Sequence, residues 1–237
     1  MIMRKIANFS IFLVILSLFF GCNTENQYPR NETVYQSKQF NYLALGDSYT
    51  IGSGECASCR FPEQLKAGLQ NFFPNDDFLL QIIARSGWTT SVLKSEIELV
   101  NPFNKFDLVT LLIGVNNQYQ NRPFSLYETE FPELVNKAIY LAKSDKSNLI
   151  VVSIPDYAFT PFGRGAENIS LGVAKYNSFA KKYCDDNNIL FVNITDITQQ
   201  GLIQPNLVCG DDLHPSKIAY AKFIERILPE AIKVLKN

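Results

Sequence analysis

Apolar residues recur along the chain in two alternating patterns. Short runs rich in β-branched and aromatic residues are typical of buried strands, and they occupy Tyr42–Leu45, Phe78–Ala84, Leu108–Ile113, Leu149–Ile154 and Ile189–Ile194. Longer stretches with apolar residues at helical spacing follow them, at Pro62–Phe73, Thr89–Val100, Phe124–Lys143, Glu167–Asp186 and Ser216–Leu235. This alternation predicts an α/β protein, a three-layer α/β/α sandwich with a mostly parallel, five-stranded sheet.

The N-terminal segment has a pattern of its own. Arg4 and Lys5 precede a nearly unbroken apolar run over Ile11–Phe20. That run is short for a membrane span but has the charged-then-apolar order of a secretory signal. The polar residues that follow lack periodicity and are typical of a tether. We therefore expect a signal peptide at 1–21, a polar tether at 22–38 and one folded domain at 39–237.

Composition and charge limit the classes of partner. Removal of the signal takes the 22 basic residues down to 20 against 23 acidic ones, so the mature charge is near −3. Such a balance gives no support for nucleic-acid binding. One histidine and scattered carboxylates make a poor ligand set, so neither a metal nor another cofactor is expected. We expect a monomer.

Cysteine usage fits an exported protein. Besides Cys22, the chain has Cys56, Cys59, Cys184 and Cys209. Disulfides are the plain interpretation in an oxidising compartment, and four cysteines allow three connectivities. We favour Cys56–Cys59 with Cys184–Cys209, and free thiols at all four positions stay an alternative.

Several polar loops come directly after predicted strands. They are Gly46-Asp47-Ser48, Arg85-Ser86-Gly87-Trp88 and Gly114-Val115-Asn116-Asn117, and a further loop, Gly210-Asp211-Asp212-Leu213-His214-Pro215, precedes the last helix. Each alone is typical of a turn or a helix cap. Because ligands of open parallel sheets bind beyond the carboxyl ends of the strands, we expect the loops to lie together.

These loops contain the parts of an acyl-transfer site. His214 is the only histidine, which makes it the natural candidate for a general base at neutral pH. Asp211, three residues earlier, can orient the ring, and Ser48 needs such a base to become a nucleophile. The backbone N–H groups of Ser48 and Gly87 and the Asn116 amide are candidate donors to an oxyanion.

From about Phe40 onward, the chain resembles the GDSL/SGNH hydrolase family. The four hallmark residues of that family match Ser48 in GDSYT, Gly87 in RSGWT, Asn116 in IGVNN and His214 in DDLHPS. The resemblance implies a flavodoxin-like SGNH fold and a metal-independent serine hydrolase of carboxylic esters or thioesters, with lysophospholipids and acetylated sugars among the substrates. It further implies that Ser48, Asp211 and His214 are catalytic, and that Ser48, Gly87 and Asn116 form the oxyanion hole.

The family pattern also bears on two neighbouring positions. It puts the acid three residues before the histidine, which selects Asp211 and leaves Asp212 to cap the following helix or face solvent. The third block commonly ends Gly-x-Asn-Asp, whereas this chain has Asn117. Because the family role rests on Asn116, we expect activity to be retained, with altered loop hydrogen bonding or substrate preference.

The stretch Phe19-Phe20-Gly21-Cys22 resembles the lipobox of bacterial lipoproteins. It implies lipidation of Cys22 and a location in the bacterial cell envelope, anchored to a membrane and facing the periplasm or the cell surface. Phe19 departs from the usual leucine, so ordinary cleavage and an uncleaved anchor stay open.

Other interpretations remain at this stage. A flavodoxin-like protein could hold the FMN phosphate on Ser48, Thr50 and Ser53, and a binding lipoprotein could keep the fold without turnover. The aromatic loop Ser153–Gly163 either lines an acyl pocket or lies on the surface. Trp88 is expected to pack rather than to line the site.

Overall fold

The computed structural model describes residues 36–103 and 105–236. The predicted signal peptide, the lipidation site at Cys22 and nearly all of the predicted tether lie outside these ranges. Within them, every helix is too short or too polar to serve as a membrane span.

Five parallel strands form one sheet in the order β2-β1-β3-β4-β5. The strands are β1 (Gln39–Gly46), β2 (Asp77–Ala84), β3 (Leu108–Leu112), β4 (Leu149–Val152) and β5 (Leu190–Val192). Their positions and direction confirm the predicted α/β sandwich. All residues of β3 and β4 are buried, because central parallel strands are covered on both faces and therefore read as unbroken apolar runs.

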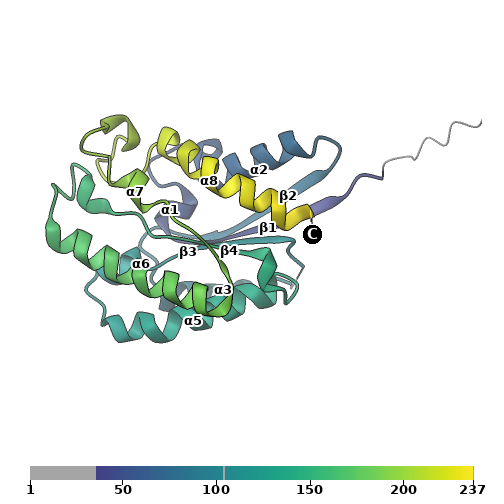
Figure 1. Cartoon of the computed structure of the whole chain (residues 1–237), viewed down its shortest axis with the longest axis horizontal. Helices are drawn as coiled ribbons and strands as arrows, with labels where there is room; N and C mark the ends of the chain where they lie inside the picture. Colours follow the sequence, from purple (N-terminus) through teal and green to yellow (C-terminus); the bar gives the residue numbers. More distant parts are fainter. Residues whose placement is uncertain (1–35, 104, 237) are drawn as a thin grey trace, which may run out of the picture. The chain divides into compact units, whose positions relative to one another are not determined.

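Helices cover both faces of the sheet (Figure 1). On one face lie α2 (Phe61–Phe72) and α8 (Lys217–Lys236), which pack against each other, and on the other lie α3 (Thr90–Val100), α5 (Phe124–Leu141) and α6 (Glu167–Asn187). The predicted helices coincide with these five to within two residues at each end. Shorter helices come at strand ends: α1 (Ser48–Ile51), α4 (Val115–Tyr119) and α7 (Thr195–Thr198). The described residues also contain single 3₁₀ turns, namely η1 (Ala57–Cys59), η2 (Lys146–Asn148), η3 (Tyr157–Phe159) and η4 (Pro205–Leu207).

The core is largely apolar, and one buried polar pair joins two of its central strands. Burying each large aliphatic side chain of α8, such as Ile227, stabilises the fold by about 1.5–3 kcal/mol. Thr110 in β3 is fully buried, and its hydroxyl lies 2.9 Å from Oη of Tyr42 in β1. That hydrogen bond removes the cost of an unpaired hydroxyl between two central strands.

One predicted disulfide is present and the other is wrong. Cys56 and Cys59 are bonded, with their Cα atoms 5.0 Å apart. Cys184 and Cys209 are free and buried in different surroundings. Cys184 belongs to the hydrophobic core on α6, whereas the thiol of Cys209 contacts Asp211 in the loop before α8. Each sulfur is therefore enclosed by other groups.

Candidate active site

Ser48 lies where β1 turns into α1. The strand ends at Gly46, where a Cβ atom would meet the backbone oxygen of Leu112 at 2.4 Å, so only glycine fits against β3. Asp47 then accepts a hydrogen bond from the Tyr49 N–H (3.0 Å) and starts the short helix. Ser48 is the first residue of that helix and lines a cavity at the sheet edge.

Asp47 is a buried carboxyl group next to this serine. Its side chain is fully buried, and burial raises its pKa to about 7 against the opposing effect of the Tyr49 N–H. One of its oxygens, Oδ2, has no hydrogen-bond partner among the described residues. Asp47 therefore changes its charge in the neutral pH range.

The loop that carries His214 is closed by its own backbone. The N–H of Cys209 donates to the carbonyl of His214 (2.8 Å), and Val208 and Pro215 form an antiparallel bridge. Asp211 lies within this loop, and its Oδ1 accepts from the backbone N–H of His214 (2.9 Å). Its Oδ2 lies 2.6 Å from His214 Nδ1.

Asp211 is held in its ionised form. Desolvation raises its pKa, but the hydrogen bonds from Cys209, His214 and Leu213 outweigh that effect and hold the pKa well below its usual range. A carboxylate only accepts hydrogen bonds, so Nδ1 of His214 carries the proton and Nε2 is free to accept one. The ring of Tyr49, the residue after Ser48, packs beside this imidazole with its centroid 5.2 Å away.

Asp212 has a different environment from Asp211. It is exposed, and its backbone carbonyl accepts a hydrogen bond from the N–H of Phe162 (3.0 Å). The hydroxyl of Ser216 accepts from the N–H groups of Ile218 (3.2 Å) and Ala219 (3.3 Å) at the start of α8. The expectation that Asp212 caps this helix is therefore wrong, because Ser216 fills that place, and the alternative of a solvent-facing side chain holds.

The candidate oxyanion donors line the same cavity as Ser48 and His214. Gly87 has a φ of +83°, and nothing lies within 4 Å of a Cβ placed there, so its backbone conformation and not space demands glycine. Asn116, in α4, donates from Nδ2 to the backbone oxygen of Trp88 (3.0 Å). An amide nitrogen has two protons, so one remains for a ligand. Trp88 itself packs against the core, as predicted.

Asn117 holds the segments around these donors together. It is fully buried, its Oδ1 accepts from the Thr90 N–H (2.9 Å), and its Nδ2 donates to Thr90 Oγ1 (2.6 Å). The Thr90 hydroxyl in turn donates to Glu130 of α5 (2.5 Å), which also accepts from Ser91 (2.8 Å). The departure from the family pattern thus sits in a network that uses an amide as both donor and acceptor.

The cavity has a volume of about 210 Å³. Besides the predicted Ser48, Gly87, Asn116 and His214, it is lined by Tyr49, Ser86, Val115, Tyr119, Tyr157, Phe162 and Leu213. The aromatic loop Ser153–Gly163 therefore lines the site through two of its residues. Tyr119 was missed, although it lies three residues after Asn116, a spacing that brings both to one face of a helix.

Three aromatic rings form one wall of this cavity. The centroids of Tyr119 and Tyr157 are 6.0 Å apart, and Phe162 lies 6.1 Å from Tyr119. Tyr157 is buried and its Oη donates to Gln118 (2.7 Å), whereas Tyr119 and Phe162 are about half exposed. We call Tyr119, Tyr157 and Phe162 the aromatic wall.

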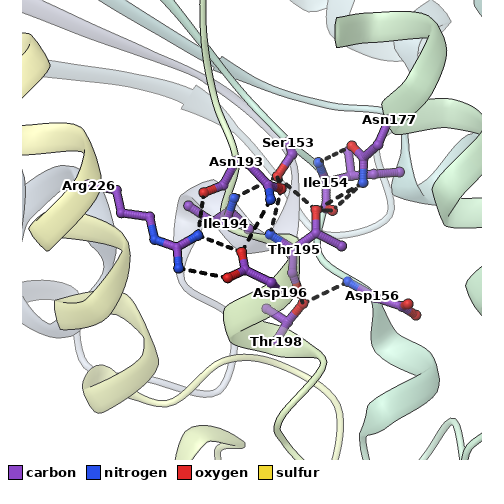
Figure 2. Close-up of polar contacts among 10 residues, drawn as sticks. All are labelled: Ser153, Ile154, Asp156, Asn177, Asn193, Ile194, Thr195, Asp196, Thr198 and Arg226. Atoms are coloured by element: carbon purple, nitrogen blue, oxygen red, sulfur yellow. Dashed lines mark hydrogen bonds and ion pairs between the residues drawn. The ribbon is translucent and has the colours of Figure 1, made fainter.

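A polar network fixes the chain that leads into this wall (Figure 2). Asn177 of α6 brackets Ile154, accepting from its N–H (2.8 Å) and donating to its carbonyl (2.9 Å). The Asp156 N–H donates to Thr198 Oγ1 of α7 (2.9 Å). Arg226 of α8 pairs with Asp196 on the other side of the same network. These contacts hold the backbone on the N-terminal side of Tyr157 in place.

The fold and the residues gathered at its edge define an enzyme that hydrolyses ester bonds. The chain belongs to the GDSL-like lipase/acylhydrolase family, whose model matches residues 44–222, so the resemblance found in the sequence is confirmed. None of the curated protein sequences compared with the chain matches it.

Solved structures share the fold at low sequence identity. A member of the lipolytic G-D-S-L family from Veillonella parvula is 17% identical, with a TM-score of 0.63, over 84% of this chain and 99% of that chain. The acetylxylan esterase Axe2 from Geobacillus stearothermophilus is 20% identical, with a TM-score of 0.63, over 82% and 95%. A structure of TesA is 16% identical, with a TM-score of 0.63, over 82% and 99%.

Proposed function

We propose that the protein is a serine esterase that cleaves small, uncharged acyl esters through an acyl-enzyme intermediate on Ser48. The contact between Asp211 and His214, at one side of a cavity that Ser48 also lines, supports this assignment most strongly. The fold alone would not, because one fold hosts many functions and the site has to carry the argument.

The chemistry follows from the positions of the donors and acceptors. Nε2 of His214 takes the proton of Ser48 as Oγ attacks the ester carbonyl, and Asp211 stabilises the imidazolium that forms. The N–H groups of Ser48 and Gly87 and the Asn116 amide stabilise the oxyanion. The imidazolium gives its proton to the departing alcohol, leaving an acyl-Ser48 ester. Water, deprotonated by the same imidazole, then releases the acid and restores the serine.

The lining of the cavity points to an uncharged substrate. His214 is the one titratable base among the lining side chains, and neither lysine nor arginine lines the cavity. The small volume suits a short acyl group, and the half-exposed rings of Tyr119 and Phe162 offer flat apolar surface to the remainder of the ester. An acetylated sugar is one such ester, and Axe2, with the same fold, is named an acetylxylan esterase.

The alternative of an FMN phosphate site after β1 is not supported by the surroundings of Thr50 and Ser53. Thr50 is fully buried against Gly46, so its hydroxyl is out of reach of a bound phosphate. The hydroxyl of Ser53 lies 2.5 Å from that of Ser86 and is already engaged. An FMN site at this loop would need both hydroxyls free.

Two measurements test the esterase assignment. The wild-type protein is expected to react with a fluorophosphonate probe and to hydrolyse aryl acetates faster than longer acyl esters, acyl-CoA or lysophospholipid; acetylated xylan completes the panel. Ser48→Ala is expected to abolish both reactions while leaving thermal stability nearly unchanged, because loss of one hydroxyl creates no large cavity. A variant that keeps most of its turnover contradicts the acyl-enzyme mechanism.

We also propose that Cys22 is lipidated and anchors the protein in a membrane of the bacterial cell envelope. The charged start, the apolar run Ile11–Phe20 and the Gly21-Cys22 step support this. The full-length protein should partition into detergent, and Cys22→Ser should move it to the aqueous phase. Unchanged partition of the variant would indicate that the uncleaved apolar run is the anchor.

A further inference from the structure

The thiol of Cys209 lies beside the candidate catalytic carboxylate, yet the mechanism above makes no use of it. Cys209 is 6% exposed and is one of two free cysteines among the described residues. Its Sγ lies 2.9 Å from Oδ1 of Asp211. The backbone oxygen of Ser53 is a more distant acceptor, at 4.0 Å.

The thiol keeps its proton in this position. Burial, together with the hydrogen bond to Asp211 and its negative charge, raises the pKa of Cys209 to about 11, and the more distant Glu55 acts in the same direction. A protonated thiol donates, and an ionised carboxylate only accepts. The hydrogen bond therefore runs from Sγ to Oδ1, and Cys209 is a poor nucleophile.

Cys209 lies two residues before Asp211 in the same loop, but its side chain also contacts a second segment of the chain. The N–H groups of Leu213 (3.0 Å) and His214 (2.9 Å) belong to the same loop as the carboxylate and move with it. The thiol of Cys209 instead faces the segment after Ser48. A Cβ on Gly54 would lie 2.4 Å from the sulfur and 2.8 Å from Oδ2 of Asp211, so this segment closes over both groups.

The carboxylate of Asp211 is partly open to solvent. Its side chain is 36% exposed, compared with 13% for His214. Water can therefore compete for the carboxylate, and rotation about Cβ–Cγ would carry Oδ2 away from Nδ1. A donor fixed on Oδ1 opposes that rotation.

We propose that Cys209 is a positioning residue whose thiol holds the Asp211 carboxylate in the orientation that aligns His214. This inference rests on the proposed role of Ser48, Asp211 and His214, and it adds a residue that the mechanism does not require to touch the substrate. A hydroxyl at position 209 supplies the same kind of donor, whereas a methyl group supplies none.

The test compares two variants with a matched control. Cys209→Ala removes the donor and Cys209→Ser replaces it with a hydroxyl. Cys184→Ala, the control, removes the same atoms from the other buried free thiol, which lies in the hydrophobic core. Each purified protein is assayed for kcat and KM on an aryl acetate and for thermal stability.

Because His214 is the only histidine in the chain, the downfield proton NMR signal of its Nδ1–H is assigned without ambiguity. This signal reports the contact with Asp211 independently of activity. Cys209→Ala is expected to lower kcat about 10-fold with KM unchanged and to broaden or lose the signal. Cys209→Ser is expected to keep most of the wild-type kcat and most of the NMR signal. Cys184→Ala should lower thermal stability while keeping the wild-type kcat and signal.

The outcomes separate this inference from the proposed function. A Cys209→Ala variant with the wild-type kcat and the wild-type NMR signal overturns the positioning role. Equal losses in Cys209→Ala and Cys209→Ser also overturn it, because packing and not hydrogen bonding would then be at work. If the wild-type protein lacks esterase activity, the esterase assignment is contradicted. If Cys209→Ala still loses the NMR signal in that case, the thiol contact is supported independently of the assignment.

Discussion

Oδ2 of Asp211 lies 2.6 Å from Nδ1 of His214, whereas the adjacent Asp212 contacts Phe162 through its backbone carbonyl. Asp212 has a φ of +64°, which turns the chain between the two carboxylates. Two neighbouring acids of identical chemistry thus have different surroundings, and only the first is in contact with the imidazole.

This contact predicts unequal effects of two conservative substitutions. Asp211→Asn removes the charge that supports the imidazolium and allows the wrong tautomer, so kcat should fall by about 10³-fold or more near neutral pH. Asp212→Asn should change kcat by less than about 3-fold. Steady-state kinetics on both variants show which aspartate supports His214. A larger loss of kcat in Asp212→Asn would refute the choice of Asp211.

Asn116 is expected to act on the transition state. Asn116 lines the same cavity as Ser48 and has one amide proton left for a ligand, so Asn116→Ala should lower kcat by about 10²–10³-fold with little change in KM. Gln120→Ala is the matched control: Gln120 donates to the backbone oxygen of Gly87 (2.9 Å) but does not line the cavity. It should cost less than about 5-fold. A rise in KM alone for Asn116→Ala would make this residue a ground-state binder.

The aromatic wall should influence binding more than chemistry. Phe162→Ala and Tyr119→Ala each remove a half-exposed ring from the cavity and should raise KM for aryl esters by about 3- to 10-fold, with kcat nearly constant. Leu202→Ala serves as the control, because Leu202 is 44% exposed but outside the cavity lining. If the KM of all three variants equals that of the wild-type protein, the rings do not contact the substrate.

Asp47 predicts a pH dependence of stability. Its pKa is about 7 in the folded protein, against an ordinary value of 3.8. The folded state therefore binds the proton more tightly, and this stabilisation is complete below about pH 4 and is lost as the pH rises through 7, by up to about 1.4 kcal/mol per pH unit.

The isosteric variant Asp47→Asn removes that titration and keeps an oxygen for the Tyr49 N–H. The free energy of unfolding of the variant, relative to wild type, should therefore increase between pH 5 and pH 8 in urea titrations. A difference that stays constant across this range would show that Asp47 keeps the same charge throughout it.

The sequence predicts the strands and long helices well for a physical reason. Buried parallel strands such as Leu108–Leu112 and amphipathic helices such as α8 extend over enough residues for their periodicity to be visible. Helices of four or five residues at the strand ends span little more than one turn and show no period. The loop motifs nevertheless identify Ser48, Gly87, Asn116 and His214, because glycine and side-chain chemistry mark them.

What the sequence could not predict depends on contacts between distant segments. The predicted disulfide between Cys184 and Cys209 is wrong because spacing along the chain does not show which groups surround a buried thiol. The network around Asn117 joins segments that only packing brings together, and the contact of Cys209 with Asp211, two residues apart, depends on how the two side chains are oriented. At these places side-chain geometry, and not sequence pattern, decides which groups are in contact.

The Asn117 network allows one further test, on the position where the chain departs from its family. Thr90 Oγ1 has a single proton, which it donates to Glu130 while it accepts one from Asn117. Asn117→Asp would place a second carboxylate against that hydroxyl, and the two acids would compete for its proton at a buried site. We expect the substitution to lower the free energy of unfolding by about 2–4 kcal/mol.

A compensating change distinguishes this mechanism from a general loss of packing. In Asn117→Asp with Glu130→Gln, the amide moves to position 130 and can donate to Thr90, whose proton then goes to the carboxylate introduced at position 117. The double variant should recover at least half of the lost stability in urea unfolding, giving a coupling energy of about 2–3 kcal/mol. Glu130→Gln alone serves as the control and should cost about 1 kcal/mol. If the two substitutions are additive, Asn117 and Glu130 do not share the Thr90 hydroxyl in the way the structure describes.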